Sequence, residues 1–454
     1  MSIAALPKEI LDKIVDHIAE VPDDVYPSKK PLKAVALSAR CFLHRCQSHL
    51  FRDISIPTTG IPTSLLDVLE TKPGLLKHVR KLVVWLNVTS QPLAQQRALL
   101  RIAEHLEGLE RLLLISSNHK GDCSWNYLGA VRQTAITKMF EEQPLVHLTL
   151  CGILDIPFRP VASLPHLQTV HLTQAATFSG VEELAVQWKL VSLRCNQLAY
   201  QALPALLSLN APAVGNSLVY LQLQVPTLEG HKAAWKILLC AGDSPLEFLR
   251  IEYARTYELN TNILSQSLNE VILRNYTLPT YSCLRYIDIQ LYSIGDNSAT
   301  NVGGGGALSS PSYIPRFLHK MLGQNPQPAL VALQIHTDWI TNGDPTSQLA
   351  HVTLIDRDRG WGLVDDTLSD SKLFPCLQAV RVRSEMTLNP PPEAEITGTT
   401  AADVKTKIRL ETSSALYKTG EAVKAFDVGY EGGDRMFDAI AKPLLATEKK
   451  FIRI

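Results

Sequence analysis

The sequence lacks an excess of charge of either sign. Its 454 residues include 44 Lys and Arg against 44 Asp and Glu, so the formal net charge is zero, and only 19% of residues are charged. Proteins that mainly grip nucleic acid carry clustered excess Lys and Arg, and disordered tail proteins are charge-rich and poor in apolar residues. Both classes are therefore excluded. A chain of this length that is 46% hydrophobic can bury a large core.

Paired cysteines and an unbroken apolar run are also missing, and no leader sequence is expected. The eight cysteines are scattered and none forms a Cys-x-x-Cys pair, which favours a reducing compartment over a disulfide framework. Charges begin at Lys8 with no basic region before an apolar run, so no signal peptide is expected. The uncharged stretch 195–228 is broken by prolines and does not offer the roughly 20 apolar residues of a membrane helix. We expect a soluble cytoplasmic and/or nuclear protein without nucleic-acid or membrane partners.

The first 56 residues carry the clearest helical pattern. Pro7 suits a first helical position, and two further short patterns follow a proline-containing linker at 21–31. A unit of about fifty residues stands at the edge of independent stability, so it is either a helical cap on the rest of the chain or a module that docks on a partner. Its apolar positions are Ile10, Leu11, Ile14, Val15 and Ile18 in the first helix, Leu32, Val35 and Ala36 in the second, and Phe42, Cys46 and Leu50 in the third.

Two segments of this region, LPKEILDKIVDHIAE and LKAVALSARCFLHRCQSHLFRDISI, resemble an F-box. The chain departs from the family pattern at Ala39, where many members have Cys, and at Phe42, where many have Trp. The 21–31 linker is also longer than in short members, and lengthening a loop costs only about 0.6 kcal/mol per doubling. The matching positions are Leu6, Pro7, Glu9, Ile10, Ile14, Leu32, Leu37, Arg40, Phe42, Leu50, Phe51 and Arg52.

The resemblance implies a specific partner. F-box modules dock on the Skp-type adaptor, which bridges them to a cullin–RING ubiquitin ligase. Such a docked apolar unit would bury an interface of about 1,200–2,000 Å². The sequence does not separate the module's own core from its contact surface, so one set of adaptor-binding candidates covers both roles. These are Leu6, Pro7, Ile10, Leu11, Ile14, Leu32, Val35, Leu37, Phe42 and Leu50.

From residue 79 to 382 one pattern recurs, namely an apolar residue, two residues, an apolar residue, one residue and a third apolar residue. The first and last starts lie 298 residues apart over eleven intervals. The mean interval of about 27 residues lies within the leucine-rich-repeat period, but single intervals vary from 16 to 46, so the array is irregular. The starts are Val79, Leu109, Leu145, Leu167, Leu190, Leu218, Leu246, Leu268, Leu284, Leu330, Leu349 and Leu377.

The segments between these starts include four predicted helices, at 92–106, 129–143, 231–241 and 313–324. Short strands that alternate with helices fit a leucine-rich-repeat-like solenoid whose strands line one concave face. The alternative is an ordinary α/β domain with a parallel sheet. The consensus Asn or Cys position is Asn87 in the first repeat and mostly other residues later, so the backbone groups of the turns must be satisfied differently.

The expected fold class is therefore α/β, with a small N-terminal three-helix F-box followed by an irregular leucine-rich-repeat-like solenoid. We expect an F-box-like module at 1–56, a repeat domain at 57–388, and a C-terminal cap or partly disordered tail at 389–454. Within the tail, 410–426 and 436–445 are candidate helices.

Several residue clusters of catalytic or metal-binding types do not form a site. Acidic residues at 356–370 do not match a calcium-loop spacing and are expected in a solvated loop. Residues 303–306 are glycines without the Gly-Lys-Ser/Thr ending of a phosphate loop, and no nucleophile elbow is present. No catalytic residue, metal or cofactor is therefore expected. Four zinc-competent residues spread around one helix and cannot converge on an ion, namely Cys41, His44, Cys46 and His49.

Aromatic residues on or just after the candidate strands are either core or binding anchors, because Trp and Tyr are favoured at protein interfaces. Both alternatives stay open for each of them. They are Trp85, Trp188, Tyr253, Tyr257, Tyr292, Trp339 and Trp361.

The F-box resemblance implies a substrate-recognition subunit of a cullin–RING ligase, which holds the adaptor by its N-terminal helices and an unknown target by its repeat body. Such a subunit is not an enzyme and needs no cofactor. A scaffold without ubiquitin transfer is the alternative, and an enzyme with an undetected site in an α/β body is the least favoured. A chain with zero net charge lacks self-repulsion, so we also expect poor solubility without the partner.

Overall fold

The computed structural model shows a mixed α/β fold with an extensive parallel sheet, so the predicted fold class is confirmed at that level. The chain divides into two compact units, Met1–Trp188 (unit 1) and Lys189–Ile454 (unit 2), while the predicted boundaries after residues 56 and 388 stay predictions. No helix in the described part of the chain has the length and apolar composition needed to cross a membrane. The structure describes residues 6–20, 29–87, 92–116, 123–173, 176–180, 188–195, 217–225, 228–253, 277–295, 313–341, 360–388, 406, 410–428 and 435–452.

Unit 1 begins with three short helices, α1 (Lys8–Glu20), α2 (Lys30–Ser38) and α3 (Arg40–Leu50). The carbonyl of Pro7 accepts the N–H of Ile10 at 3.0 Å, so the first helical turn opens at the predicted proline. The extended residue Ala39 separates α2 from α3. The three helices bury apolar faces against one another in a shared core of Leu11, Val15, Leu32, Phe42 and Cys46.

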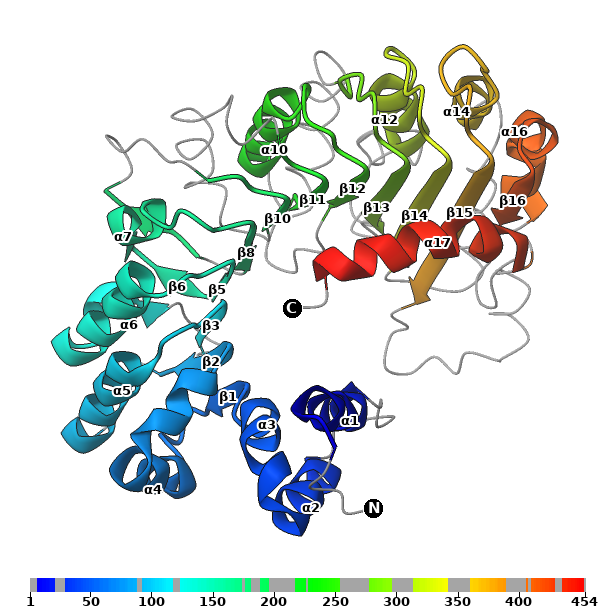
Figure 1. The fold of residues 1–454 in the computed structure, drawn as a ribbon. Helices are drawn as coiled ribbons and strands as arrows, with labels where there is room; N and C mark the ends of the chain where they lie inside the picture. Colours follow the sequence, from blue (N-terminus) through cyan, green and yellow to red (C-terminus); the bar gives the residue numbers. More distant parts are fainter. Residues whose placement is uncertain are drawn as a thin grey trace, which may run out of the picture. The chain divides into compact units, whose positions relative to one another are not determined.

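The rest of unit 1 is a parallel sheet with helices on one face (Figure 1). Hydrogen-bonded neighbours follow the order β1-β2-β3-β5-β8. The strands are β1 (Asp53–Ile56), β2 (Lys81–Leu86), β3 (Arg111–Ser116), β5 (His147–Cys151) and β8 (Thr169–Thr173). The helices are α4 (Thr63–Thr71), α5 (Leu93–His105), α6 (Ala130–Glu142) and α7 (Phe158–Ala162), and two short strand pairs are β4 (Cys123–Ser124) with β6 (Ile153–Leu154) and β7 (Ile156–Pro157) with β9 (Phe178–Ser179).

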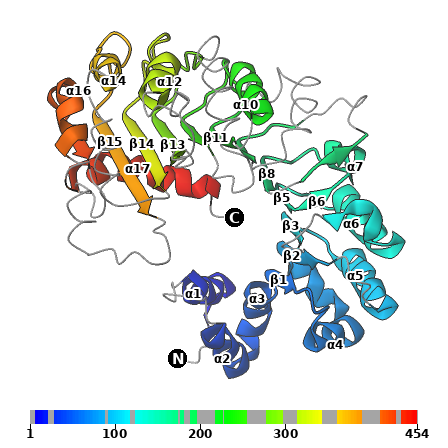
Figure 2. The ribbon, with the colours of Figure 1, turned by 180° about the vertical axis from the view of Figure 1, so that it is seen from behind.

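Unit 2 repeats this arrangement, and Figure 2 shows α10, α12, α14 and α16 on one face of the parallel strands and α17 on the other. Hydrogen-bonded neighbours follow the order β10-β11-β12-β13-β14-β15-β16. The strands are β10 (Ser192–Cys195), β11 (Tyr220–Gln224), β12 (Phe248–Glu252), β13 (Tyr286–Gly295), β14 (Ala332–Thr341), β15 (Ala379–Leu388) and β16 (Ala425–Val428). The helices are α10 (Leu228–Cys240), α12 (Tyr313–Leu322), α14 (Trp361–Leu368), α16 (Tyr417–Ala422) and α17 (Arg435–Ile452).

The recurring apolar pattern marks the strands. In the described part of the chain, each predicted start is followed two residues later by the first residue of a strand, as Leu109 is followed by β3. Leu268 and Leu349 lie outside the described residues. The second and third apolar positions, such as Leu112 and Leu114, are buried toward the helices because alternate strand residues share a face. The intervening strand residues therefore form an open face, on the side of the sheet away from those helices.

The four predicted helices between the strands are confirmed as α5, α6, α10 and α12. The prediction of one helix over 410–426 is partly wrong, because the chain leaves α16 at Ala422 and continues into β16. Val423, Phe426 and Val428 repeat the strand pattern, and Ala425 pairs with Ala379 of β15.

The prediction that Asp365 belongs to a solvated loop is also wrong, because this residue lies in α14. Its side chain is buried and its Oδ1 accepts the N–H of Thr419 at 2.8 Å and the hydroxyl of the same residue at 2.9 Å. The carboxylate therefore fixes α16 to α14. Asp356 and Asp358 of the same predicted loop lie outside the described residues.

Two buried glutamines satisfy the backbone between neighbouring repeats, where a consensus asparagine is missing. Gln143 donates to the carbonyl of Leu106 at 2.8 Å and accepts the N–H of Leu109 at 3.2 Å. Gln327 makes the same pair of bonds with Pro279 and Tyr281. Buried backbone groups that lacked such partners would destabilise the fold.

Candidate partner-binding surfaces

The structure divides the ten predicted adaptor-binding residues into core and surface. Leu11, Leu32 and Phe42 belong to the core of the three helices, and Val35 and Leu50 pack against it partly buried. The remaining five are exposed, with Leu6 at 36%, Ile10 at 44%, Ile14 at 40% and Leu37 at 88% of full accessibility, and Pro7 also exposed.

Four of the exposed residues lie in α1 or directly before it and are called the α1 stripe, namely Leu6, Pro7, Ile10 and Ile14. Ile10 and Ile14 are four residues apart, so their side chains are neighbours on the helix surface at about 5–6 Å between Cβ atoms. The core residues Leu11 and Val15 follow them by one position and point about 100° further around the helix. The apolar face of α1 is therefore wider than the part that its own core covers.

Two exposed leucines lie on the other helices. Leu37 is on the side of α2 away from Leu32, and Leu43 of α3 is 40% exposed. The sequence pattern did not predict Leu43, although its place directly after the core residue Phe42 is a signal that it points elsewhere.

An ion-pair network holds α1 against α3. Arg45 binds both carboxylate oxygens of Asp16, at 2.6 and 2.8 Å, and His49 Nε2 lies 2.7 Å from Oδ1 of the same carboxylate. The hydrogen bond from Arg45 is the main cause that lowers the pKa of Asp16 to about 2 from 3.8. This network orients the helix that carries the α1 stripe.

The four zinc-competent residues of α3 have separate surroundings. Cys46 is buried in the helix core, which raises the pKa of its thiol. His49 meets Asp16, whereas Cys41 and His44 are exposed. Across the residues that the structure describes, no three side chains of metal-binding type come together.

The open face of unit 1 carries three rows of side chains, because parallel strands align them in register. The first row joins Lys81, Arg111 and His147, with Asp53 opposite Lys81 on β1. Burial, with a smaller effect of the Arg111 charge, lowers the pKa of His147 to about 4. The histidine is therefore neutral at pH 7, and the row consists of one carboxylate, then two cations, then a neutral imidazole.

The next two rows on this face are apolar at β2 and β3. Val83 aligns with Leu113, and Trp85 aligns with Ile115. Trp85 is 38% exposed and the other three side chains are partly exposed. We call the set Lys81, Val83, Trp85, Arg111, Leu113 and Ile115 the unit 1 surface.

The other candidate aromatic anchors differ from Trp85. Trp188 and Trp361 are buried in the core. Tyr253 is partly buried, and its hydroxyl lies 3.1 Å from Nδ1 of His231. Tyr257 lies outside the described residues, and the side chains of Tyr292 and Trp339 lie outside the described parts of β13 and β14.

On unit 2 the helix α17 lies across the open face of the strands (Figure 1). Alanines at the first position of β14, β15 and β16 leave room for its close approach. The buried cluster beneath it consists of Tyr220, Phe248, Tyr286, Ala332, Ala379 and Ala425 from the strands and Phe437, Ala441 and Leu444 from α17.

Charged contacts hold α17 beside this apolar row. Arg381 of β15 reaches Asp438 of α17 at 2.8 Å and Asp427 of β16 at 2.6 Å, and its guanidinium lies 3.9 Å from the centre of the Phe437 ring. Arg250 of β12 lies 2.7 Å from Asp288. The first rows of the unit 2 face are therefore covered within the chain.

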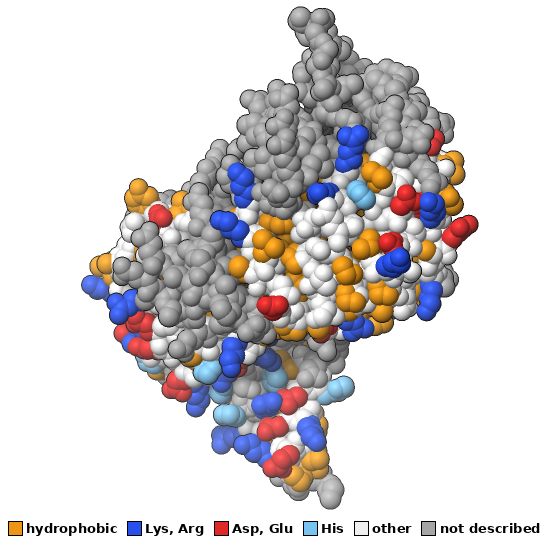
Figure 3. All heavy atoms as spheres, turned by 90° about the horizontal axis from the view of Figure 1, so that it is seen from above, with side chains coloured by type: hydrophobic (Ala, Val, Ile, Leu, Met, Phe, Trp, Pro, Cys, Tyr) orange, Lys and Arg blue, Asp and Glu red, His pale blue; other side chains and the backbone are white. Residues whose placement is uncertain are grey.

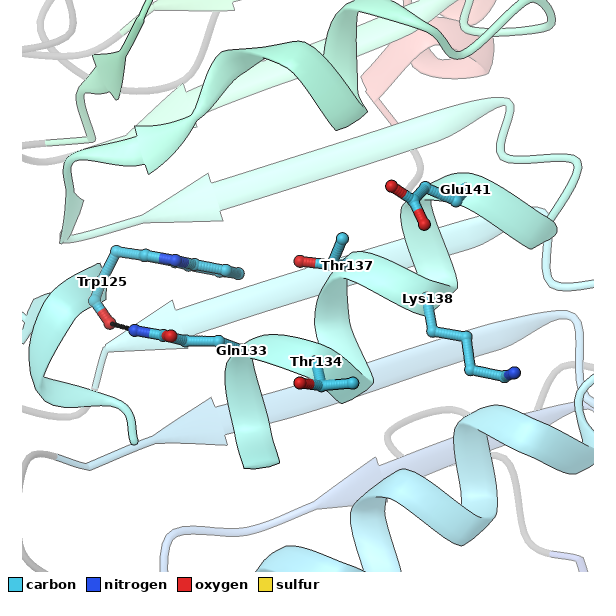
Figure 4. A pocket seen from close by; sticks show the side chains of 6 residues that line it. All are labelled: Trp125, Gln133, Thr134, Thr137, Lys138 and Glu141. Carbon is cyan, nitrogen blue, oxygen red and sulfur yellow. Dashed lines mark hydrogen bonds between the residues drawn. The ribbon is translucent and has the colours of Figure 1, made fainter. Parts of the chain in front are cut away.

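A hollow on the helix side of unit 1 offers no reactive arrangement (Figure 4). Gln133 donates to the carbonyl of Trp125 at 2.9 Å, and the hydroxyl of Thr134 donates to its own helix backbone. Lys138 pairs with Glu142 at 2.9 Å, so the lysine is engaged in a surface ion pair. The lining residues are Trp125, Gln133, Thr134, Thr137, Lys138 and Glu141.

Charge is evenly distributed on the face seen in Figure 3, where basic and acidic side chains are interspersed among apolar ones. This matches the zero net charge of the sequence. Such a face lacks the single-sign field that steers highly charged ligands.

Comparisons with known proteins add no assignment. The chain matches no model of a protein family, and a search of curated proteins finds no similar sequence.

Proposed function

We propose that this chain is the substrate-recognition subunit of a cullin–RING ubiquitin ligase. Its N-terminal helices, as an F-box, dock on a Skp-type adaptor, and its repeat body binds a target protein. The observation that carries the proposal is the α1 stripe, which stays exposed although the three helices already have a core of their own. Exposed apolar residues that lie together at the start of one helix are typical of a surface that a partner covers.

We also propose that the body is an irregular leucine-rich-repeat-like solenoid. Parallel strands begin two residues after the predicted starts of the pattern, and helices between them lie on one face of each unit. Buried glutamines such as Gln143 connect neighbouring repeats in place of an asparagine ladder. Repeats of this kind expose a row of strand side chains that partners can contact.

The proposed role needs no chemistry from this chain. A subunit that holds both adaptor and target raises the effective concentration of the target near the ubiquitin-conjugating enzyme. We therefore propose that the chain is not an enzyme. The hollow of Figure 4 and the buried Asp365 serve packing in this account.

Proximity labelling in cells tests the proposal. The full chain is compared with the variant Ile10→Asp with Ile14→Asp, with and without a proteasome inhibitor. We expect the wild type to label a Skp-type adaptor and a cullin, and the variant to lose both. We also expect at least one further labelled protein to accumulate when the proteasome is inhibited, in the wild type only.

Two other results would count against the proposal. Adaptor labelling without any change in the abundance of a labelled protein would favour the scaffold without ubiquitin transfer. Labelling that lacks the adaptor in the wild type would contradict the F-box assignment itself.

A further inference from the structure

The two open faces of the body differ in what covers them. On unit 2, α17 seals the first row of strand side chains, and Phe437 and Ala441 are fully buried there. On unit 1 the first row is polar, with Lys81 and Arg111 in register. The core of α1, α2 and α3 includes no residue of β2 or β3, so the N-terminal helices use other side chains for their own packing.

The open face of unit 1 carries apolar side chains that stay at least partly exposed among the residues that the structure describes. Leu82, Val84 and Leu112 already form the core on the helix side of β2 and β3. Trp85 and Ile115 lie in register on the other side, and more than a third of Trp85 is exposed. Tryptophan at the centre of such a surface is a frequent source of binding energy.

The charged residues of the unit 1 surface indicate which kind of peptide segment it can bind. Lys81 and Arg111 stand beside the apolar rows, and arginine binds carboxylates in a planar, bidentate manner. Asp53 is on the far side of Lys81, at the edge of the row, while His147 next to Arg111 is neutral at pH 7. The two positions of this row on β2 and β3, the strands that carry Trp85 and Ile115, are therefore basic.

The contacts of α17 show how this chain holds a segment on an open sheet face. Phe437 packs into the apolar row, while the neighbouring Asp438 pairs with Arg381 of the sheet. On α17 an apolar side chain stands next to a carboxylate. On the sheet an apolar row stands next to an arginine, and the two pairs of groups meet. The unit 1 surface offers the same two elements.

We infer that the unit 1 surface is the target-binding site of the body and that it binds an acidic peptide segment with an adjacent aromatic or aliphatic side chain. The apolar side chain packs on Trp85, Leu113 and Ile115, and the carboxylates pair with Lys81 and Arg111. The inference rests on the proposed function only in calling the bound protein a target, since the surface does not involve the N-terminal helices.

Selection from a displayed library of random 12-residue peptides tests the inference on the immobilised full chain. We expect peptides selected on the wild type to be enriched in Asp or Glu next to Leu, Ile or Phe. Trp85→Ala should weaken their binding at least tenfold. The variant Lys81→Glu with Arg111→Glu should select peptides enriched in Lys or Arg instead.

A matched control makes the same charge change on the helix side of unit 1. Lys72→Glu with Arg97→Glu alters two exposed residues there and should leave the selected peptides and their affinity unchanged. The inference would be overturned by a library that yields no binder, or by the same peptides from the wild type and the charge-reversed chain. Binding that responds to Arg383→Glu of unit 2 and not to Trp85→Ala would also overturn it.

The result of the peptide selection is independent of the test of adaptor binding. The selection contains no adaptor, so loss of adaptor binding leaves the peptide result intact. Failure of the peptide selection would remove the target site but leave docking of the α1 stripe untouched.

Discussion

Replacing two residues of the α1 stripe should abolish adaptor docking without unfolding the helices. The variant is Ile10→Asp with Ile14→Asp, at positions 44% and 40% exposed. Complete burial of an aliphatic side chain stabilises by about 1.5–3 kcal/mol, so covering the exposed two-fifths is worth roughly 0.6–1.2 kcal/mol for each residue. The aspartates add the cost of desolvating two charges without partners, which is at least comparable.

Together these contributions amount to roughly 3 kcal/mol or more, which corresponds to a loss of about a hundredfold in affinity. The assay is a titration of the full chain with a Skp-type adaptor, read as a dissociation constant. Leu11 is unsuitable for this test, because it is only 5% exposed in the helix core and its replacement by Asp would unfold the module.

A matched control introduces the same two charges at exposed leucines elsewhere. Leu239→Asp with Leu363→Asp alters residues that are 62% and 45% exposed on helices of unit 2. This control should bind the adaptor like the wild type. An Ile10 and Ile14 variant that keeps its affinity within threefold of the wild type would refute the assignment of the α1 stripe.

Three further predictions follow from the packing. Asp16→Asn should weaken hydrogen-exchange protection of α1 by about 1 kcal/mol at pH 7, since a partly exposed ion pair contributes about that much. The pKa of Asp16 lies at about 2 in the folded chain, below 3.8, so its stabilisation is complete above pH 3.8 and is lost as the pH falls through 2; equal protection at pH 7 and pH 2 would contradict this. Phe437→Ala should lower the free energy of unfolding of unit 2 by about 3–5 kcal/mol in urea denaturation, and a change below 1 kcal/mol would show that α17 is not seated as described. Without an adaptor the chain should yield little soluble monomer in size-exclusion chromatography, and abundant monomer would break the link between zero net charge and a missing partner.

The strand positions were predictable because burial of alternate residues imposes a short pattern. Leu112 and Leu114 must both face the helices, and their spacing of two is visible in the sequence. The same pattern at Val423, Phe426 and Val428 was overlooked because it follows a helical segment directly. Buried Asp365 was missed because a carboxylate that caps another helix looks like any acidic residue of a loop.

The division between core and contact residues was not predictable. Ile10 and Leu11 are both apolar and adjacent, and the angle at which α1 meets α2 and α3 decides which of them is covered. The binding position of α17 was not predictable for a similar reason. The alanines that leave room for the helix are far apart in the sequence, and only the strand register aligns Ala332 with Ala379. Residue type likewise does not distinguish Trp85, which is 38% exposed, from Trp188, which is buried, because tertiary packing decides which of them is covered.

The measurement that tests the central claim most directly is hydrogen exchange of the full chain alone and after co-expression with a Skp-type adaptor. The account predicts a stoichiometric complex in which amides of α1 become more protected and those of α17 do not change. A chain that forms no complex, or a complex that protects unit 2 and leaves α1 unchanged, would contradict it.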